Sequence, residues 1–196
     1  MTGKIKIDII SDVVCPWCII GYKRLEKAIA ELGIQDQIEL EWQPFELNPN
    51  MPPEGEDIQD HLAKKYGSTP EQSRHSQANM ASLGEELGFK FEFYTGKKIV
   101  NTRDAHILLE YAKEFGQQTE LQMHLFEAYF SERKNVSDRK ILTEKLQLVG
   151  LNTDEALARL DDNAARERVQ KQEDFWLSQG VSSVPTVVIN QKSAVA

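Results

Sequence analysis

The sequence predicts an α/β protein in which a β-α-β unit is separated from a late strand by a long helical segment. Residues 4–10 (KIKIDII) alternate polar and apolar side chains, which is typical of a strand. From Pro16 to about Leu32 the apolar residues recur every three or four positions, and Gly33 supplies a helix stop. A second alternating run at 38–45 (IELEWQPF) completes the strand-helix-strand unit.

The remainder of the chain is mostly helical in pattern. Residues 46–57 carry three of the seven prolines and are expected to form a loop that leaves the sheet. Helices are expected at 58–66, 70–87 and about 102–115, from 119, from 137, from 153, and from 161 or 162 to Gly180; KFEFY (90–94) is expected to be extended.

The chain ends with a predicted strand at Val187–Ile189 and a hairpin turn at NQK (190–192). An antiparallel partner would begin at SAVA (193–196), so we expect the C-terminal hairpin strand to be cut short. We divide the chain into an N-terminal β-α-β part (1–50), a helical insertion with its connecting helix (51–179) and a C-terminal part (180–196) with a Val-Pro loop and a strand.

Charge and hydropathy argue against several classes of partner. The 196 residues carry 23 Lys plus Arg against 31 Asp plus Glu, and a nucleic acid or an anionic membrane would favour a basic face. No stretch approaches the roughly 20 apolar residues of a membrane span. At the N-terminus, Lys4, Lys6 and Asp8 interrupt the apolar residues, so the uninterrupted apolar segment of a signal peptide is not seen there. We therefore expect a cytoplasmic protein, with its oligomeric state left open.

Two cysteines, Cys15 and Cys18, are the only thiols, and they lie three positions apart in the motif CPWC. On a helix this spacing places both sulfurs on one face, where a disulfide can form and open with little rearrangement. Such a short loop restrains the unfolded chain little, so the pair is not expected to serve stability. The motif therefore indicates a redox-active dithiol.

The position of the motif assigns different roles to the two thiols. Cys15 falls where the first strand gives way to the helix, and the free N–H groups there stabilise a thiolate. Cys18, one turn further in, is expected to be shielded and to resolve a mixed disulfide formed on Cys15. Pro16 suits the first helical position and stiffens the turn, and Trp17 adds apolar bulk without charge.

Two other uses of a C-x-x-C pair, a zinc site and a pair of inert buried thiols, fit this sequence less well. A zinc site needs two further ligands, and the four histidines (61, 75, 106 and 124) form no H-x3–5-H pair, so we expect no metal. A pair of inert buried thiols would not explain the proline between them or their place between strand and helix.

Several separated motifs resemble one known family. The stretches SDVVCPWC, WQPFELNPNMPPEG, NTRDAH and GVSSVPTVVI together are similar to DsbA-like thioredoxin-fold proteins with a large helical insertion, and more narrowly to FrnE-type dithiol oxidoreductases. Related proteins are the 2-hydroxychromene-2-carboxylate isomerases and kappa-class glutathione transferases. The resemblance implies that Cys15 is the nucleophile, that Pro185 is a cis-proline beside it, and that the backbone of Val184 pairs with substrate.

The chain departs from that family in two places. Where thioredoxin and DsbA carry a buried carboxylate on the first strand, this sequence has Ile9, so water or Asp12 would have to accept the proton of Cys18. The fold normally finishes with a hairpin strand and a helix, and both are expected to be truncated here. An uncovered sheet edge would then invite association.

The leading hypothesis is a protein disulfide oxidoreductase or isomerase that acts on thiol or disulfide proteins or small molecules. It would need no bound cofactor, with glutathione as a possible reductant. The alternatives are a glutathione-dependent isomerase or transferase, which has serine at the position of Cys15, and a binding module or chaperone without chemistry. His106 is expected to cap or pack a helix or, as the lesser alternative, to face the groove as a proton carrier, and Asn101 and Thr102 to form a helix N-cap.

Overall fold

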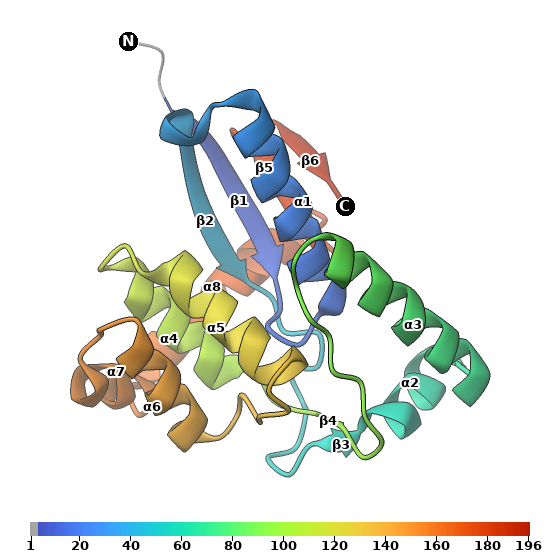
Figure 1. Cartoon of the computed structure of the whole chain (residues 1–196). Helices are drawn as coiled ribbons and strands as arrows, with labels where there is room; N and C mark the ends of the chain where they lie inside the picture. The colour runs from blue at the N-terminus through green and yellow to red at the C-terminus, as the bar shows by residue number, and fades with distance from the viewer. Residues whose placement is uncertain (1–3) are drawn as a thin grey trace.

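The computed structural model describes residues 4–196 and is built on a four-stranded mixed sheet with the order β2-β1-β5-β6 (Figure 1). Strand β1 (Ile5–Ser11) lies in the middle, parallel to β2 (Ile38–Pro44) and antiparallel to β5 (Thr186–Ile189). Strand β6 (Ser193–Val195) adds antiparallel to β5. The first and last parts of the chain therefore form one sheet, as the thioredoxin-like fold requires.

The connections within this sheet follow the local sequence. Helix α1 (Pro16–Leu32) ends at Gly33, whose φ of 65° is the left-handed conformation that favours glycine, and a short 3-10 turn (Gln35–Gln37) leads into β2. The predicted hairpin turn also forms. Three residues (190–192) separate the paired Ile189 and Ser193, and Asn190 and Gln191 both have positive φ, which suits a tight turn between twisted strands.

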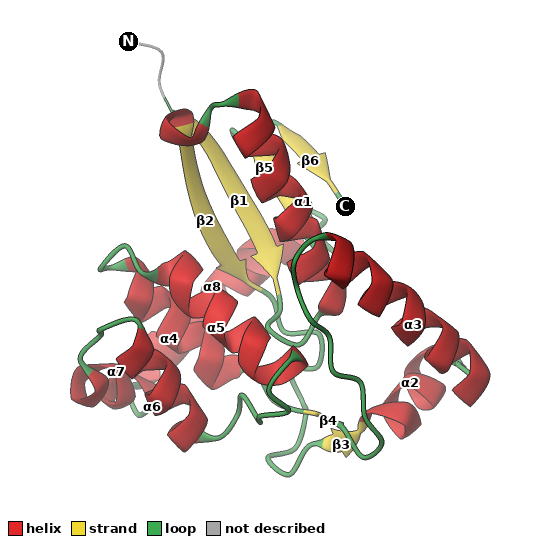
Figure 2. Cartoon of the chain, in the orientation of Figure 1, coloured by secondary structure: helices red, strands yellow, loops and turns green. Residues whose placement is uncertain are grey.

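The remaining helices come between β2 and β5 in the chain and fall into two groups (Figure 2). The first two form a hairpin at the side of the sheet domain. The others pack together below the sheet, and the last of them also covers the lower part of one sheet face. Their bounds are α2 Ile58–Tyr66, α3 Pro70–Glu86, α4 Arg103–Lys113, α5 Gln118–Phe130, α6 Arg139–Leu148, α7 Thr153–Leu160 and α8 Asn163–Ser178.

Most helix starts agree with the predictions because their caps are local. Thr69 and Gln72 form a capping box at α3, and Asn152 and Asp162 cap α7 and α8. Helix α6 is capped by Asp138, one residue later than the predicted Ser137.

The segment 90–94, expected to be extended, contains no helix and joins no sheet of the described chain. Phe91 is buried against Phe130, with ring centroids 5.3 Å apart, and Glu92 N–H donates to the Phe130 carbonyl. The extended pairing occurs beside it, where β3 (Glu56–Asp57) and β4 (Lys98–Ile99) form a two-residue antiparallel ladder.

The core lies on both faces of the sheet. Trp42 is buried between Tyr22 of α1 and Phe126 of α5, with ring centroids 5.0 and 5.9 Å away. On the opposite face Trp176 of α8 packs near Ile10.

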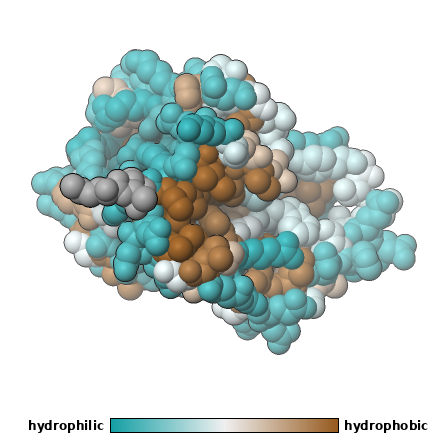
Figure 3. Space-filling view, turned by 90° about the horizontal axis from the view of Figure 1, so that it is seen from above, coloured by the Kyte–Doolittle hydropathy of each residue, from teal (hydrophilic) through white to brown (hydrophobic). Residues whose placement is uncertain are grey.

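One edge of the sheet is open to solvent. All three residues of β6 are exposed, and the end of the molecule seen from above in Figure 3 carries a contiguous apolar area bordered by hydrophilic side chains. Among residues 4–196, no helix is long and apolar enough to cross a membrane.

We predict that Gly84→Ala destabilises the protein by about 1–2 kcal/mol. A Cβ at Gly84 of α3 would lie 2.6 Å from the Phe89 carbonyl oxygen and 2.5 Å from the Phe91 ring, which outweighs the helix-propensity gain of about 1 kcal/mol. Urea unfolding measures the change, with the exposed Ser82→Ala as the control. An unfolding free energy equal to or above that of the unchanged protein would contradict the prediction.

Candidate active site

The CPWC motif lies at the junction of β1 and α1. Cys15 is the N-cap residue of the helix, with extended backbone, and Pro16 occupies the first helical turn. The Cys15 N–H donates to the Asp12 carbonyl oxygen at 3.0 Å, and this bond closes the turn that follows the strand. The sequence predicted this placement, and it puts the Cys15 sulfur at the end of the helix where backbone N–H groups are free.

The two thiols differ in accessibility. Both are free in the structure, and Cys18 is fully buried whereas Cys15 retains 4% of its surface and lines a cavity. Burial raises the pKa of Cys18 well above the usual thiol value, and the neighbouring Cys15 raises it further; the Ser11 hydroxyl and the Asp12 backbone act in the opposite direction. Reagents in the cavity therefore meet Cys15, with Cys18 behind it as a protonated thiol.

The loop before β5 faces the Cys15 sulfur. The Val184–Pro185 peptide bond is cis, and the Cys15 thiol donates to the Val184 carbonyl oxygen at 3.7 Å. Pro185 also sits against Gly21 of α1, where an added Cβ would lie 3.2 Å from the proline ring. The fold thus brings together residues 169 positions apart.

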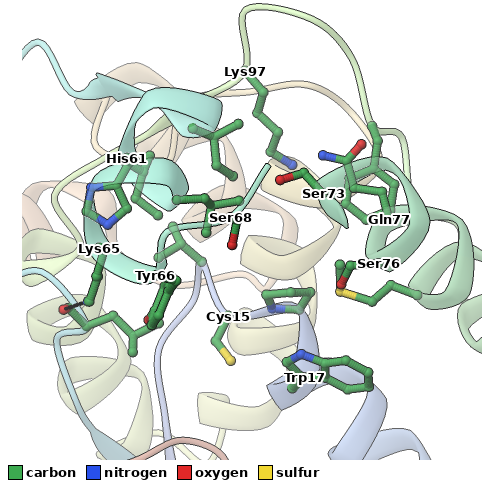
Figure 4. A pocket seen from close by; sticks show the side chains of 18 of the residues that line it. Cys15, Trp17, His61, Lys65, Tyr66, Ser68, Ser73, Ser76, Gln77 and Lys97 are labelled. Atoms are coloured by element: carbon green, nitrogen blue, oxygen red, sulfur yellow. Dashed lines mark hydrogen bonds between the residues drawn. The ribbon is translucent and has the colours of Figure 1, made fainter. Parts of the chain in front are cut away.

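A cavity of about 680 Å³ opens at Cys15 (Figure 4). Its floor includes Cys15 and the half-exposed Trp17, and its walls come from α2, α3 and the segment before β4. This volume falls in the range typical of small-molecule sites. Val184 also lines the cavity, so a ligand inside it can reach both the sulfur and the cis-proline loop.

A cluster of buried charged side chains lies behind the β1–α1 turn. Asp12 accepts the Leu47 N–H at 2.8 Å, and its other oxygen lies 3.4 Å from Nε2 of His106 on α4. Glu46 accepts from Arg103, the first residue of α4, at 2.7 Å. A third carboxylate, Glu173 of α8, is buried beside them with no hydrogen bond to one of its oxygens.

Mutual charge and burial shift the pKa values in this cluster. Burial would lower the pKa of His106, but the Asp12 carboxylate outweighs it and the net direction is upward. Burial, aided by the charge of Glu46, raises the pKa of Glu173 to about 7, against the opposing effects of His106 and Arg103. Burial likewise raises the pKa of Glu46, although its bond to Arg103 opposes this.

Several predicted residues therefore have a defined place and others do not join the site. His106 does not line the cavity, so the idea that it faces the groove is wrong; it is buried against Asp12. Asn101 accepts the Arg103 N–H and so caps α4, whereas the hydroxyl of Thr102 makes no capping bond. Ile9 is part of the apolar core.

Sequence reasoning missed the buried carboxylates Glu46 and Glu173 and the partner of Glu46, Arg103, and it missed Lys97 as a cavity residue. An isolated charged residue in a loop or helix does not indicate burial in the sequence, because the residues that bury it are distant along the chain. Within residues 4–196 no group of three His, Cys, Asp or Glu side chains is arranged to hold a metal ion.

Comparison with known proteins fits this geometry. The family model described as a DSBA-like thioredoxin domain matches residues 6–196, so the chain belongs to that family of thiol-disulfide oxidoreductases. The protein YwbO of Bacillus subtilis (strain 168) is similar, with 29% identity over 191 residues, which cover 96% of this chain and 88% of YwbO.

Two solved structures place the fold more closely. A probable DsbA oxidoreductase from Streptomyces coelicolor is 29% identical, with a TM-score of 0.91 over 98% of this chain and 83% of that one. The cytosolic disulfide reductase DsbM from Pseudomonas aeruginosa, solved with GSH, shares the fold at 15% identity, with a TM-score of 0.68 over 97% of this chain and 89% of that one.

We predict that Glu173→Gln changes how stability depends on pH. The folded pKa of about 7 exceeds the ordinary value of 4.5, so the folded state binds a proton that the unfolded state has released, and this contribution to stability is lost as pH rises from 4.5 through 7. The variant should therefore gain stability relative to the unchanged protein over that interval, by roughly 1–2 kcal/mol after allowance for solvent screening.

Urea unfolding at pH 5, 6, 7 and 8 measures this difference, with the exposed Glu167→Gln on the same helix as the matched control. A difference that stays constant with pH would contradict the assigned ionisation of Glu173.

Proposed function

We propose that this protein is a thiol-disulfide oxidoreductase or isomerase in which Cys15 is the nucleophile and Cys18 the resolving thiol. The observation that carries the proposal is the asymmetry of the pair: Cys15 lines the cavity at a helix N-terminus, and Cys18 is fully buried one turn behind it. Such an arrangement lets substrate reach one sulfur and reserves the other for the second step.

The proposed reaction consists of two thiol-disulfide exchange steps. The Cys15 thiolate attacks one sulfur of a substrate disulfide, forms a mixed disulfide and releases the first substrate thiolate. Cys18, as its thiolate, then attacks the Cys15 sulfur and releases the second. The protein dithiol is oxidised to a disulfide by two electrons, and the substrate disulfide is reduced to two thiols that take up the two protons. The reverse sequence oxidises a substrate dithiol.

The environment of Cys18 supports the order of these steps. Burial raises the pKa of Cys18. The adjacent Cys15 raises it further, through a hydrogen bond and through the negative charge of its thiolate. When Cys15 enters a mixed disulfide its negative charge is gone, so the pKa of Cys18 falls at the stage when its thiolate is required. The Ser11 hydroxyl and the Asp12 N–H remain to stabilise that thiolate.

The cis-proline loop supplies the second half of the site. The Val184 carbonyl oxygen is aimed at the Cys15 sulfur, and the backbone there is able to pair with an extended substrate segment. Pro185 has no N–H to bind the thiolate. Pro16 and Trp17 set the turn and the apolar surface beside it. Substrates would be thiol or disulfide proteins or small molecules, with no bound cofactor and with glutathione as the reductant in a cytoplasmic setting.

A glutathione-dependent isomerase or transferase is the second candidate. The cavity beside Cys15 is large enough for a small molecule, which favours it. That class has no use for a buried thiol at Cys18, however, and a non-catalytic binding module has no use for either thiol. The two candidates therefore differ in how they depend on the cysteines.

We predict that Cys18→Ser traps substrate on Cys15. The reduced variant, mixed with a disulfide substrate, should accumulate a mixed disulfide on Cys15 because the resolving thiol is absent, whereas Cys15→Ser should form none and lose at least 100-fold in exchange rate. Intact-mass spectrometry after acid quenching detects the adduct.

If the Cys15→Ser variant keeps a glutathione-dependent isomerase activity, the second candidate is favoured. Equal adduct on the two variants would refute the assigned roles.

A further inference from the structure

Lys97 is a buried cation inside the active-site cavity that the proposed exchange reaction does not use. The residue retains 3% of its surface and precedes β4, and its ammonium group points into the cavity from the side opposite Cys15 (Figure 4). A buried ammonium is costly unless it is paired, and buried charges in proteins normally have a partner.

The described chain satisfies this ammonium group in part. Its Nζ donates to the Tyr129 carbonyl oxygen at 3.0 Å, and it lies 4.1 and 4.7 Å from the centroids of the Tyr129 and Phe130 rings. No carboxylate pairs with it in residues 4–196: burial is the sole cause acting on its pKa, which falls to about 8. An ammonium has three donors, so the single backbone acceptor leaves two for a ligand.

The position of Lys97 is fixed by its neighbours. Its own carbonyl oxygen accepts the Ile58 N–H at the start of α2, and the Tyr129 hydroxyl donates to the carbonyl of the next residue, Lys98. The ammonium is therefore held between α2 and the end of α5. A charge held in place in this way pays little conformational entropy when it binds.

The rest of the cavity is also suited to an anion. No aspartate or glutamate of the described chain lines it, although acidic residues outnumber basic ones in the sequence by 31 to 23. The other titratable groups that face it, besides Cys15, are His61, Lys65 and Tyr66. Ser73 and Gln77 of α3 add uncharged hydrogen-bonding groups.

We propose that Lys97 binds a carboxylate of a small-molecule disulfide or thiol whose sulfur reacts at Cys15. This deepens the proposed function and rests on it. The buried ammonium of Lys97 matches one negative charge, and the volume of the cavity beside Cys15 suits a low-molecular-weight substrate rather than a folded protein. The electron balance is that of the exchange itself: the disulfide is reduced to two thiols and the Cys15–Cys18 dithiol is oxidised.

The test compares three symmetrical disulfides of similar size, without any other reductant. The probes are 3,3′-dithiodipropionate (anionic), 2-hydroxyethyl disulfide (neutral) and cystamine (cationic). The fully reduced protein is mixed with each at pH 7, and the rate of Cys15–Cys18 disulfide formation is followed by acid quench and mass spectrometry. The ratio of anionic to neutral rate constants cancels the intrinsic reactivity of Cys15.

The unchanged protein should prefer the anionic probe over the neutral one by roughly tenfold to hundredfold, because hydrogen bonds to charged groups are strong. Lys97→Met should abolish that preference, and Lys97→Arg should retain part of it. The matched control is Lys98→Met, whose side chain donates to the Glu54 carbonyl and does not line the cavity; it should keep the preference.

The pH dependence gives a second readout on the unchanged protein, which holds even if Lys97→Met fails to fold. Because the pKa of Lys97 is about 8, the anionic-to-neutral ratio should be highest below pH 8 and decline as pH rises through it. A purely structural role for Lys97, bonding the end of α5, would leave this ratio unchanged.

The outcomes separate the two levels of the proposal. If no probe is reduced, the proposed function fails. If all three are reduced at similar rates, or if Lys97→Met keeps the preference, exchange stands and the carboxylate site is overturned. A Lys97-dependent preference seen with disulfide-linked acidic peptides but not with the small probes would also overturn the small-molecule assignment.

Discussion

Strand β1 ends with three hydrogen bonds that fix its neighbours. The Ser11 carbonyl accepts the Phe45 N–H at 3.1 Å, the Asp12 carbonyl accepts the Cys15 N–H at 3.0 Å, and the Asp12 carboxylate accepts the Leu47 N–H at 2.8 Å. One short turn thereby holds the exit of β2 and the start of α1 together. The position of the Cys15 sulfur follows from these bonds, because a displaced turn would move the helix N-terminus with it.

The same turn connects the sheet to the helical insertion. Asp12 lies against His106 of α4, and Glu46, Arg103 and Glu173 extend the buried charges across to α8. Burial raises the pKa of Glu173 and Glu46, and the other carboxylates of the group, which outnumber the cations, add to both shifts. Protons held in this cluster therefore stabilise the contact of the β1–α1 turn with helices α4 and α8.

The sequence allowed the thioredoxin-like fold and the CPWC junction to be predicted because both depend on short-range patterns. Alternating isoleucines mark β1, and Pro16 marks the first helical turn. The alternation at 90–94 indicated extended chain but not what it packs against: Phe91 contacts Phe130, a partner 39 positions away that the pattern does not reveal.

The charged parts of the site escaped prediction for a related reason. Lys97 and Glu173 are ordinary in sequence, and their significance comes from burial by segments that are distant along the chain. Cys15 was identifiable because its partner is three residues away. The role proposed for Val184 came from family resemblance, since only the fold brings this residue to the Cys15 sulfur.

The proposed exchange requires that Cys15 and Cys18 form a reversible intramolecular disulfide. Equilibration of the intact protein over a range of reduced-to-oxidised glutathione ratios, with alkylation and mass spectrometry as the readout, measures whether it forms. We expect one reversible two-electron transition, at a potential between the ~−270 mV of thioredoxin and the ~−120 mV of DsbA. Absence of an intramolecular disulfide at every ratio would contradict it.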